Sequence, residues 1–281
     1  MAPKKVTVRD LLALKGKRKI VNSSVMDVSM ARIIDASDVD MTGAGASNAA
    51  MIIQGHRTPI PATLDQVLIY LRPIADALKR ALLAATLPYG TYQACNEDAL
   101  HTAIAYMQAG VDSVKIEGTG RMLDRIHAIT SAGIPCMGHV GMAPQQIHVT
   151  GGYRAVGKTA AEAVKVYEDA MLLQEAGVWI VELECVPWRV AERITEDLKI
   201  LTVGTGSGIG CDAQGLMTQD VWGLIEPVKP RLAKQYVDLH TMSVEALERF
   251  KQETKEGRFP PDDKVAEIPD SEFERFVDMV A

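Results

Sequence analysis

The sequence has few cysteines and no long apolar run. Its four cysteines, Cys95, Cys136, Cys185 and Cys211, are spread without the Cys-x-x-Cys spacing of metal and redox motifs. We therefore expect reduced thiols and a cytoplasmic location. No stretch of about 18 consecutive apolar residues occurs, which argues against a membrane-spanning helix. The basic segment 1–19 lacks the apolar core of a signal peptide, so we expect a solvated lead segment.

An excess of positive charge is also lacking, and this limits the kinds of partner. The formal net charge is −6, so we expect neither a nucleic acid nor a membrane surface to bind this chain. The apolar fraction is 47% of 281 residues, which is sufficient for a large core, and no linker divides the sequence. We expect one domain over residues 1–281, with an N-terminal lead segment and a C-terminal helical tail.

Short apolar runs alternate with amphipathic segments along most of the chain. Nearly continuous apolar runs of this length are typical of strands that are covered on both faces. They occupy residues 19–24, 38–43, 82–88, 111–118, 134–141, 178–185, 200–206 and, weakly, 221–225. Strand–helix alternation repeated about eight times predicts a (β/α)8 TIM barrel, with a doubly wound parallel sheet as the alternative.

Three of the segments between these runs have a helical pattern: residues 96–110, 159–177 and 187–198. Gly177 is expected to end the second of them. Its predicted buried stripe consists of Ala160, Ala163, Val164, Tyr167, Ala170 and Met171.

Ionisable residues gather where the predicted strands end, which is where a parallel barrel carries its catalytic groups. Lys115 and Glu117 are two residues apart, as are Glu182 and Glu184, so each pair lies on one face of its strand. His139 ends the strand between them. The sequence predicts that these groups converge in an active site. The alternative is an internal salt bridge between Lys115 and one glutamate, without a catalytic role.

The glycine-rich segment GTGSGIG, residues 204–210, follows a predicted strand. It has neither the Gly-Lys-Ser/Thr ending of a P-loop nor the spacing of a dinucleotide motif. Either its backbone N–H groups approach an anionic ligand, or it forms a tight turn only.

Several motifs, in order, resemble those of the ketopantoate hydroxymethyltransferase family, of the phosphoenolpyruvate mutase and isocitrate lyase superfamily. They are VKIEG (114–118), GHVGMAPQ (138–145), GGYRAVGK (151–158), LECVP (183–187) and GTGSGIGCDAQGLMTQD (204–220), with QGH (54–56) and PATLDQ (61–66) before them. The resemblance covers roughly residues 19–230. It makes the glycine-rich segment the GIGAG turn of that family, a wall of the pocket.

The resemblance implies an aldol-type reaction. A base removes the C3 proton of 2-oxoisovalerate, and the enolate attacks a one-carbon unit from methylenetetrahydrofolate, or from formaldehyde. It implies Glu184 as the base, His139 in the catalytic pocket, Lys115 as the substrate anchor and Ser47 as a further substrate contact. Mg²⁺ chelated by the keto acid would stabilise the enolate, with Glu117 beside it. The resemblance also implies a ring-based homo-oligomer, usually a decamer.

The two aspartates that hold the metal in that family are missing. The GDS motif reads Gly-Ala-Ser here, which puts Ala46 at the first position, and ADLP reads Ala-Thr-Leu-Pro, which puts Thr86 at the second. The alignment needs one inserted residue before QGH, and an earlier placement would put Ser47 at the first position instead. Glu117 alone provides few ligand atoms for a hard cation, so we expect weakened or absent Mg²⁺ dependence. Ala46 and Thr86 would then line the substrate site.

Three further residues have open assignments. Asp27 and Glu182 could substitute for the lost carboxylates, although nothing in the sequence places them near enough. His148 stands where the family usually has asparagine. It could donate a hydrogen bond to an enolate or a phosphate, or lie in an exposed loop.

Three functions follow from these observations. The first is hydroxymethyl transfer to a 2-oxo acid with little or no use of a metal. The second is carbon–carbon or other carbonyl-adjacent bond chemistry on a substrate that does not chelate metal. The third is a non-catalytic paralogue that binds a metabolite, which the retained Lys115, His139 and Glu184 argue against because buried ionisable groups without a function cost stability.

Overall fold

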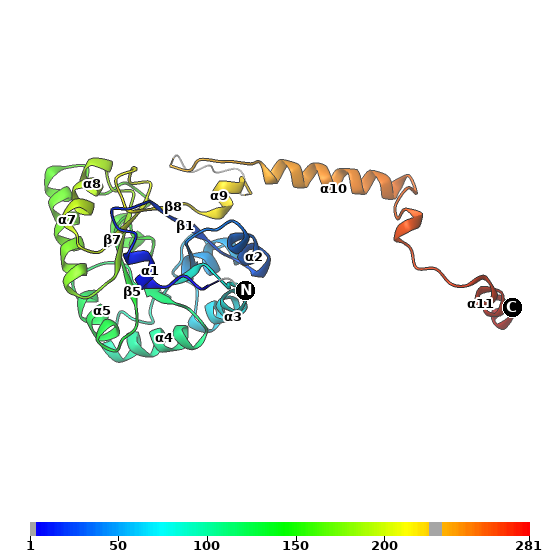
Figure 1. Ribbon diagram of the computed structural model, residues 1–281, viewed down its shortest axis with the longest axis horizontal. Helices are drawn as coiled ribbons and strands as arrows, with labels where there is room; N and C mark the ends of the chain where they lie inside the picture. The colour runs from blue at the N-terminus through cyan, green and yellow to red at the C-terminus, as the bar shows by residue number, and fades with distance from the viewer. Residues whose placement is uncertain (1–3, 225–231) are drawn as a thin grey trace. The chain divides into compact units, whose positions relative to one another are not determined.

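Eight parallel strands close into a barrel in the computed structural model, which describes residues 4–224 and 232–281 (Figure 1). Neighbours in sequence are neighbours in the barrel, and β8 pairs with β1. The strands are β1 (Ile20–Ser24), β2 (Met41–Gly45), β3 (Leu82–Thr86), β4 (Ser113–Lys115), β5 (Cys136–Gly141), β6 (Ile180–Glu184), β7 (Leu201–Thr205) and β8 (Ala213–Gly215). The predicted TIM barrel is therefore confirmed.

Helices connect most of the strands and form the outer layer (Figure 1). They are α1 (Val8–Leu12), α2 (Val28–Ala36), α3 (Leu64–Ala77), α4 (Asn96–Gln108), α5 (Met122–Ser131), α6 (Ile147–Thr150), α7 (Ala160–Glu175), α8 (Trp188–Asp197) and α9 (Thr218–Trp222). The three predicted helices are α4, α7 and α8. Gly177 has a φ of +93°, as expected of a glycine that follows a helix.

Two details of the prediction were wrong. The weak eighth strand over 221–225 is not a strand, because Thr218–Trp222 is helix α9; residue 225 lies outside the described residues. The eighth strand is the three-residue β8, reached from β7 without an intervening helix. In α7 the buried residues are Val166, Ala170 and Leu173, whereas Val164 of the predicted stripe is 54% exposed.

The barrel interior divides into an apolar half and a polar half. Side chains near the amino ends of the strands form the hydrophobic core, which α1 closes with Leu11. The core also contains Ile20, Met41, Leu82, Ala84, Met137, Trp179, Ile180, Leu201, Val203 and Ala213. Nearer the carboxyl ends, ionisable side chains take over, and this is the half where barrels carry their chemistry.

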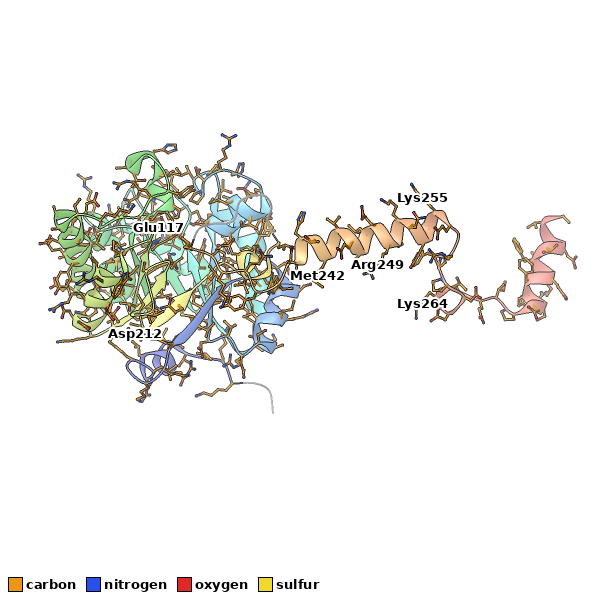
Figure 2. All side chains as sticks on the ribbon, turned by 90° about the horizontal axis from the view of Figure 1, so that it is seen from above. Glu117, Asp212, Met242, Arg249, Lys255 and Lys264 are labelled. Carbon is orange, nitrogen blue, oxygen red and sulfur yellow. The ribbon has the colours of Figure 1, made fainter. Side chains whose placement is uncertain are left out.

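Residues 235–281 belong to a second compact unit. It contains α10 (Leu239–Lys255), a 3-10 turn (Asp262–Lys264) and α11 (Asp270–Val280). Neither helix buries a residue within the described part of the chain. Met242 and Arg249 mark α10 in Figure 2. Exposed apolar residues of this unit include Met242, Leu247, Phe250, Phe273, Phe276 and Val280.

Candidate active site

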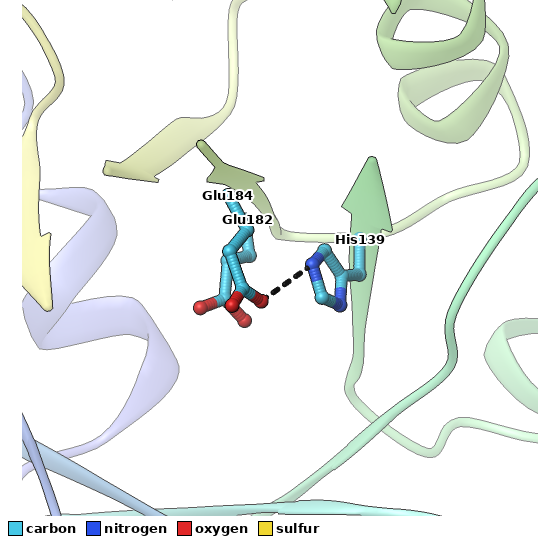
Figure 3. Close-up of side chains that lie close together, drawn as sticks. All are labelled: His139, Glu182 and Glu184. Atoms are coloured by element: carbon cyan, nitrogen blue, oxygen red, sulfur yellow. Dashed lines mark ion pairs between the residues drawn. The ribbon is translucent and has the colours of Figure 1, made fainter. Parts of the chain in front are cut away.

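His139 and Glu184 form a close pair inside the carboxyl end of the barrel (Figure 3). The β5–β6 register puts His139 opposite Glu182 and Gly141 opposite Glu184, so the two strands bring the imidazole and both carboxylates together. His139 is fully buried, and its Nε2 lies 3.1 Å from Oε2 of Glu184. The contact has an ion-pair distance but not hydrogen-bond direction, since neither ring nitrogen has a hydrogen-bond partner. The imidazole and the Glu184 carboxylate therefore lie in direct contact inside the barrel.

Lys115 pairs with Glu182 across the barrel. Its Nζ bonds Oε2 of Glu182, while the hydroxyl of Thr205 donates to Oε1 at 2.8 Å. The salt bridge that the sequence offered as an alternative to catalysis is therefore present, and it uses Glu182. Glu184 remains outside it, paired with His139.

Burial and neighbouring charges shift the pKa values of these groups in opposite directions. Burial alone would raise the pKa of Glu182, but the charges of Lys115 and His139, with the hydrogen bonds from Lys115 and Thr205, together outweigh it and lower that pKa to about 2. Burial would lower the pKa of Lys115, yet Glu182 and Glu117 raise it. For His139, burial and Lys115 disfavour the imidazolium, but Glu182 and Glu184 raise the net pKa. The cluster therefore holds one permanent cation, Lys115, and a histidine whose pKa the neighbouring carboxylates raise.

Glu117 occupies the other side of the cluster, just beyond the end of β4. Its buried Oε2 accepts a hydrogen bond from the backbone N of Gln145 at 2.8 Å. Gln145 is fixed in turn, because its side chain bonds the Tyr92 hydroxyl at 2.7 Å and the Leu87 carbonyl at 2.8 Å. Burial raises the pKa of Glu117, which favours its protonated form.

The positions of the two missing aspartates lie side by side. Gly45, the last residue of β2, is in register with Thr86, the last residue of β3, and Ala46 follows directly. A side chain at Gly45 would approach the backbone N of Thr86 to 2.5 Å, so the strands touch closely here. Ala46 and Thr86 are both buried. A methyl offers no ligand and a hydroxyl is a weak one, so the two positions fit poorly to a hard divalent cation, which prefers charged oxygen ligands.

A π-helix, Asn48–Ile53, follows Ala46. Its wider turn is shown by the Gln54 N–H, which donates to the Ala49 carbonyl at 3.0 Å, a five-residue step. A π turn contains one residue more than an α turn would hold, so it can absorb a single insertion. If the inserted residue lies in this π-helix, it follows both Ala46 and Ser47. The alignment then puts Ala46, and not Ser47, at the first aspartate position.

A second set of ligand atoms lies on β5 and β6. Oxygen and nitrogen atoms of His139, Glu182 and Glu184 lie within 4.8 Å of one another, a set that a transition metal could use. However, Lys115 already holds Glu182, and Nδ1 of His139 lacks the second partner that metal-bound histidines have. The arrangement is better suited to ion pairing and proton transfer.

The other predicted residues are more dispersed. Ser47 is half-buried at the start of the π-helix. His148 is exposed on the short helix α6, outside the buried cluster. Asp27 is an exposed helix cap that accepts a hydrogen bond from the Met30 N–H at 2.8 Å, which leaves Glu182 as the additional carboxylate of the site.

Two site residues were missed from the sequence. Thr205 stands where the GIGAG turn has isoleucine, a departure that could have indicated its polar role. Asn22 on β1 has a buried Oδ1 without a hydrogen-bond partner. Both side chains lie beside Gly215, where an added Cβ would meet Thr205 Oγ1 at 2.9 Å and Asn22 Nδ2 at 3.2 Å. The Oδ1 of Asn22 is therefore available to accept a hydrogen bond from a ligand.

The glycine-rich segment is a tight turn packed on α8. Gly208 has a φ of +85°, and an added Cβ would lie 2.4 Å from Cβ of Trp188. The Ser207 hydroxyl donates to the Leu183 carbonyl at 2.7 Å and accepts from the Val186 N–H at 2.9 Å. The turn therefore ties the end of β7 to the end of β6, next to Glu184.

A closed parallel barrel with a lysine, a histidine and three carboxylates at its carboxyl end has the architecture of a TIM-barrel enzyme. The chain belongs to the ketopantoate hydroxymethyltransferase family, whose sequence profile matches residues 5–262. A relative from Nitratidesulfovibrio vulgaris (strain DP4), 3-methyl-2-oxobutanoate hydroxymethyltransferase, is 37% identical over 273 residues, covering 97% of this chain and 89% of the relative. The family expectation is thus confirmed.

Solved structures support the fold. A phosphoenolpyruvate phosphomutase from Streptomyces platensis subsp. rosaceus has a TM-score of 0.61 at 14% identity, covering 98% of this chain and 96% of that one. A 2,3-dimethylmalate lyase, a member of the PEP mutase/isocitrate lyase superfamily, has a TM-score of 0.58 at 14% identity, covering 97% of both chains.

Within the described residues, no helix is long and apolar enough to cross a membrane.

Proposed function

We propose that this protein transfers a hydroxymethyl group to 2-oxoisovalerate, or to a closely related 2-oxo acid, by enolisation and aldol-type attack. The observation that carries the proposal is the buried His139–Glu184 pair beside Lys115 in a member of this family. A carboxylate next to an imidazole can remove a proton adjacent to a carbonyl, and fixed cations can stabilise the enolate that results.

In this mechanism Glu184 accepts the C3 proton of the oxo acid. The electron pair of the broken C–H bond moves toward the carbonyl oxygen, where His139 and Lys115, which also anchors the substrate carboxylate, stabilise the negative charge. The enolate carbon then attacks formaldehyde, whose C=O π pair moves to the oxygen, and this oxygen takes up the proton that Glu184 had accepted. Where methylenetetrahydrofolate is the donor, water adds to its one-carbon unit and supplies the hydroxyl oxygen, the C–N bonds break and tetrahydrofolate leaves. We assign Ser47 as a substrate contact, and the exposed His148 as a hydrogen-bond donor to an enolate or a phosphate.

We propose further that the reaction does not use the Mg²⁺ site of the family. Ala46 and Thr86 offer no carboxylate, which leaves Glu117 as the one carboxylate of that ligand set. The methyl of Ala46 and the side chain of Thr86 instead line the substrate site. Side-chain cations then take over the stabilisation of the enolate.

A second candidate function is carbonyl-adjacent bond chemistry on a different substrate. It is favoured by the same two replacements, because a 2-oxo acid normally chelates the metal that these positions would hold. In that case Glu184 keeps its role in proton transfer. The two candidates differ in whether 2-oxoisovalerate is enolised at all.

We also propose a homo-oligomer in the cytoplasm, with decameric rings as the expected form. The free thiols of all four cysteines agree with a reducing compartment. The apolar side chains exposed on α10 and α11 are a surface that assembly would cover.

Proton exchange at C3 of 2-oxoisovalerate in D2O, followed by NMR, tests the proposed function. We expect exchange with Mg²⁺ and equally with EDTA, because enolisation needs no one-carbon donor and, here, no metal. Exchange that required Mg²⁺ would contradict the metal-free mechanism. An absence of exchange under both conditions would favour the second candidate.

A further inference from the structure

The polar half of the barrel contains more negative than positive groups. Three carboxylates face one ammonium and one imidazole, and in the described part of the chain the ion pairs of these carboxylates are made by Lys115 and His139. With both cations charged and all three carboxylates ionised, the net charge is still negative. Protonation of Glu117 brings it only to neutrality. The site therefore has little surplus positive charge for a ligand.

Glu182 is the carboxylate that pairs with Lys115, the permanent cation of this cluster. Its two oxygens are both held, one by Lys115 and the other by the Thr205 hydroxyl at 2.8 Å. It is also buried on β6, directly opposite His139 in the register. A carboxylate fixed in this way cannot turn aside when a ligand enters. Any negative group that approaches Lys115 also approaches Glu182.

We propose that Glu182 is a specificity-determining residue that admits singly charged oxo acids and excludes doubly charged ones. This inference rests on the proposed function, since it concerns the same substrate site. A single carboxylate can share the ammonium of Lys115 with Glu182. A second negative group, such as another carboxylate or a phosphonate, would meet Glu182 or Glu184 in a buried site where like charges repel strongly. Repulsion of the unwanted ligand is a common source of specificity.

Oxamate and oxalate test the proposal, because they have nearly the same shape but one and two negative charges. We would measure both dissociation constants by titration calorimetry at pH 7.5 with EDTA present. The unaltered protein should prefer oxamate by at least about tenfold. In Glu182→Gln this preference should fall by at least about tenfold, whereas Glu182→Asp, which keeps the charge, should retain most of it.

Asp212→Asn is the matched control. Asp212 also forms a partly buried pair with a lysine, at 2.8 Å from Nζ of Lys15, but at the amino end of the barrel (Figure 2). Its removal changes the net charge by the same amount, so an effect of overall charge would appear in both variants. We expect the preference for oxamate to be unchanged in Asp212→Asn.

The outcomes separate the two proposals. If the unaltered protein binds both ligands equally, or if Glu182→Gln keeps the preference, the role of Glu182 is refuted while the proposed function stands. If neither ligand binds and no C3 exchange occurs, the proposed function fails and this inference fails with it. Should Glu182→Gln not fold, the ratio in the unaltered protein still decides, since a ratio near one overturns the proposal.

Discussion

Replacement of Glu182 by glutamine should destabilise the fold in a way that depends on pH. The carboxyl pKa falls from 4.5 to about 2 in the folded protein. Each pKa unit is worth about 1.4 kcal/mol, so the ionised carboxylate contributes about 3 kcal/mol at neutral pH. Loss of one partner of a buried ion pair costs about 3–5 kcal/mol in other proteins, which is the same range.

The sign of the pH effect follows from the lowered pKa. The contribution of Glu182 is fully present above its unfolded pKa of 4.5 and is lost as the pH falls toward about 2. The difference between Glu182→Gln and the unaltered protein should therefore be about 3 kcal/mol at pH 7 and about half of that near pH 3. Glutamine cannot titrate, so its own stability lacks this component.

Urea denaturation at a series of pH values, followed by tryptophan fluorescence, measures this difference. Trp179 is a suitable probe, because it is buried and its indole N–H donates to the Ser113 hydroxyl at 2.9 Å. The double variant Lys115→Met/Glu182→Gln should recover much of the loss, since it leaves no unpaired charge. Asp197→Asn, on an exposed pair with Arg193, should cost less than about 1 kcal/mol.

A loss below about 1 kcal/mol at pH 7 would refute the view that the Lys115–Glu182 pair is buried and tight. A loss of full size that did not change between pH 7 and pH 3 would also refute it. In that case the destabilisation would come from packing of the glutamine and not from a missing charge. Failure of the double variant to recover stability would point the same way.

Three further changes test the rest of the site and the assembly. Glu184→Gln should reduce C3 proton exchange by at least about a hundredfold, and a normal rate in the folded variant would exclude Glu184 as the base. Ala46→Asp with Thr86→Asp should create a Mg²⁺ site detectable by calorimetry, and a folded double variant that binds no Mg²⁺ would show that these are not the ligand positions. Leu247→Glu with Phe250→Glu should shift the protein to smaller species in light scattering, and an unchanged mass would show that this face of α10 is not an assembly surface.

The sequence was sufficient for the architecture and for which side chains share a face. Alternation with a period of two correctly put Glu182 and Glu184 on one face of β6, because that period is a property of any strand. Glu117 lies beyond the end of β4, so strand periodicity does not govern its position. Periodicity could not reveal that Lys115 meets Glu182, since that contact depends on barrel closure and on side-chain reach across the interior. The assignment of catalytic roles stays a prediction, because geometry brings groups together without showing that they react.

The errors also have physical causes. The β8 strand was missed because three residues after a glycine turn, Ala213–Gly215, leave no hydrophobic period to detect. The buried stripe of α7 was predicted wrongly because the helix has apolar residues on several sides. Val164 and Val166 therefore fit the periodicity of a buried helix face equally well. Only packing against β5 and β6 decides that Val166 is buried and Val164 exposed.

Loss of the metal site does not have to upset the charge balance of the barrel. Loss of one divalent cation together with two aspartates removes equal positive and negative charge. Replacement of both aspartates can therefore leave the total formal charge around a bound oxo acid unchanged. What changes is where the positive charge lies. Ala46 and Thr86, which would flank a metal, lie at the ends of β2 and β3, whereas Lys115 lies on β4, in register with Thr86, and is held by Glu182 of β6. An enolate stabilised by Lys115 and His139 must present its oxygen toward β4 and β5, which predicts a substrate turned relative to one that chelates a metal beside β2 and β3.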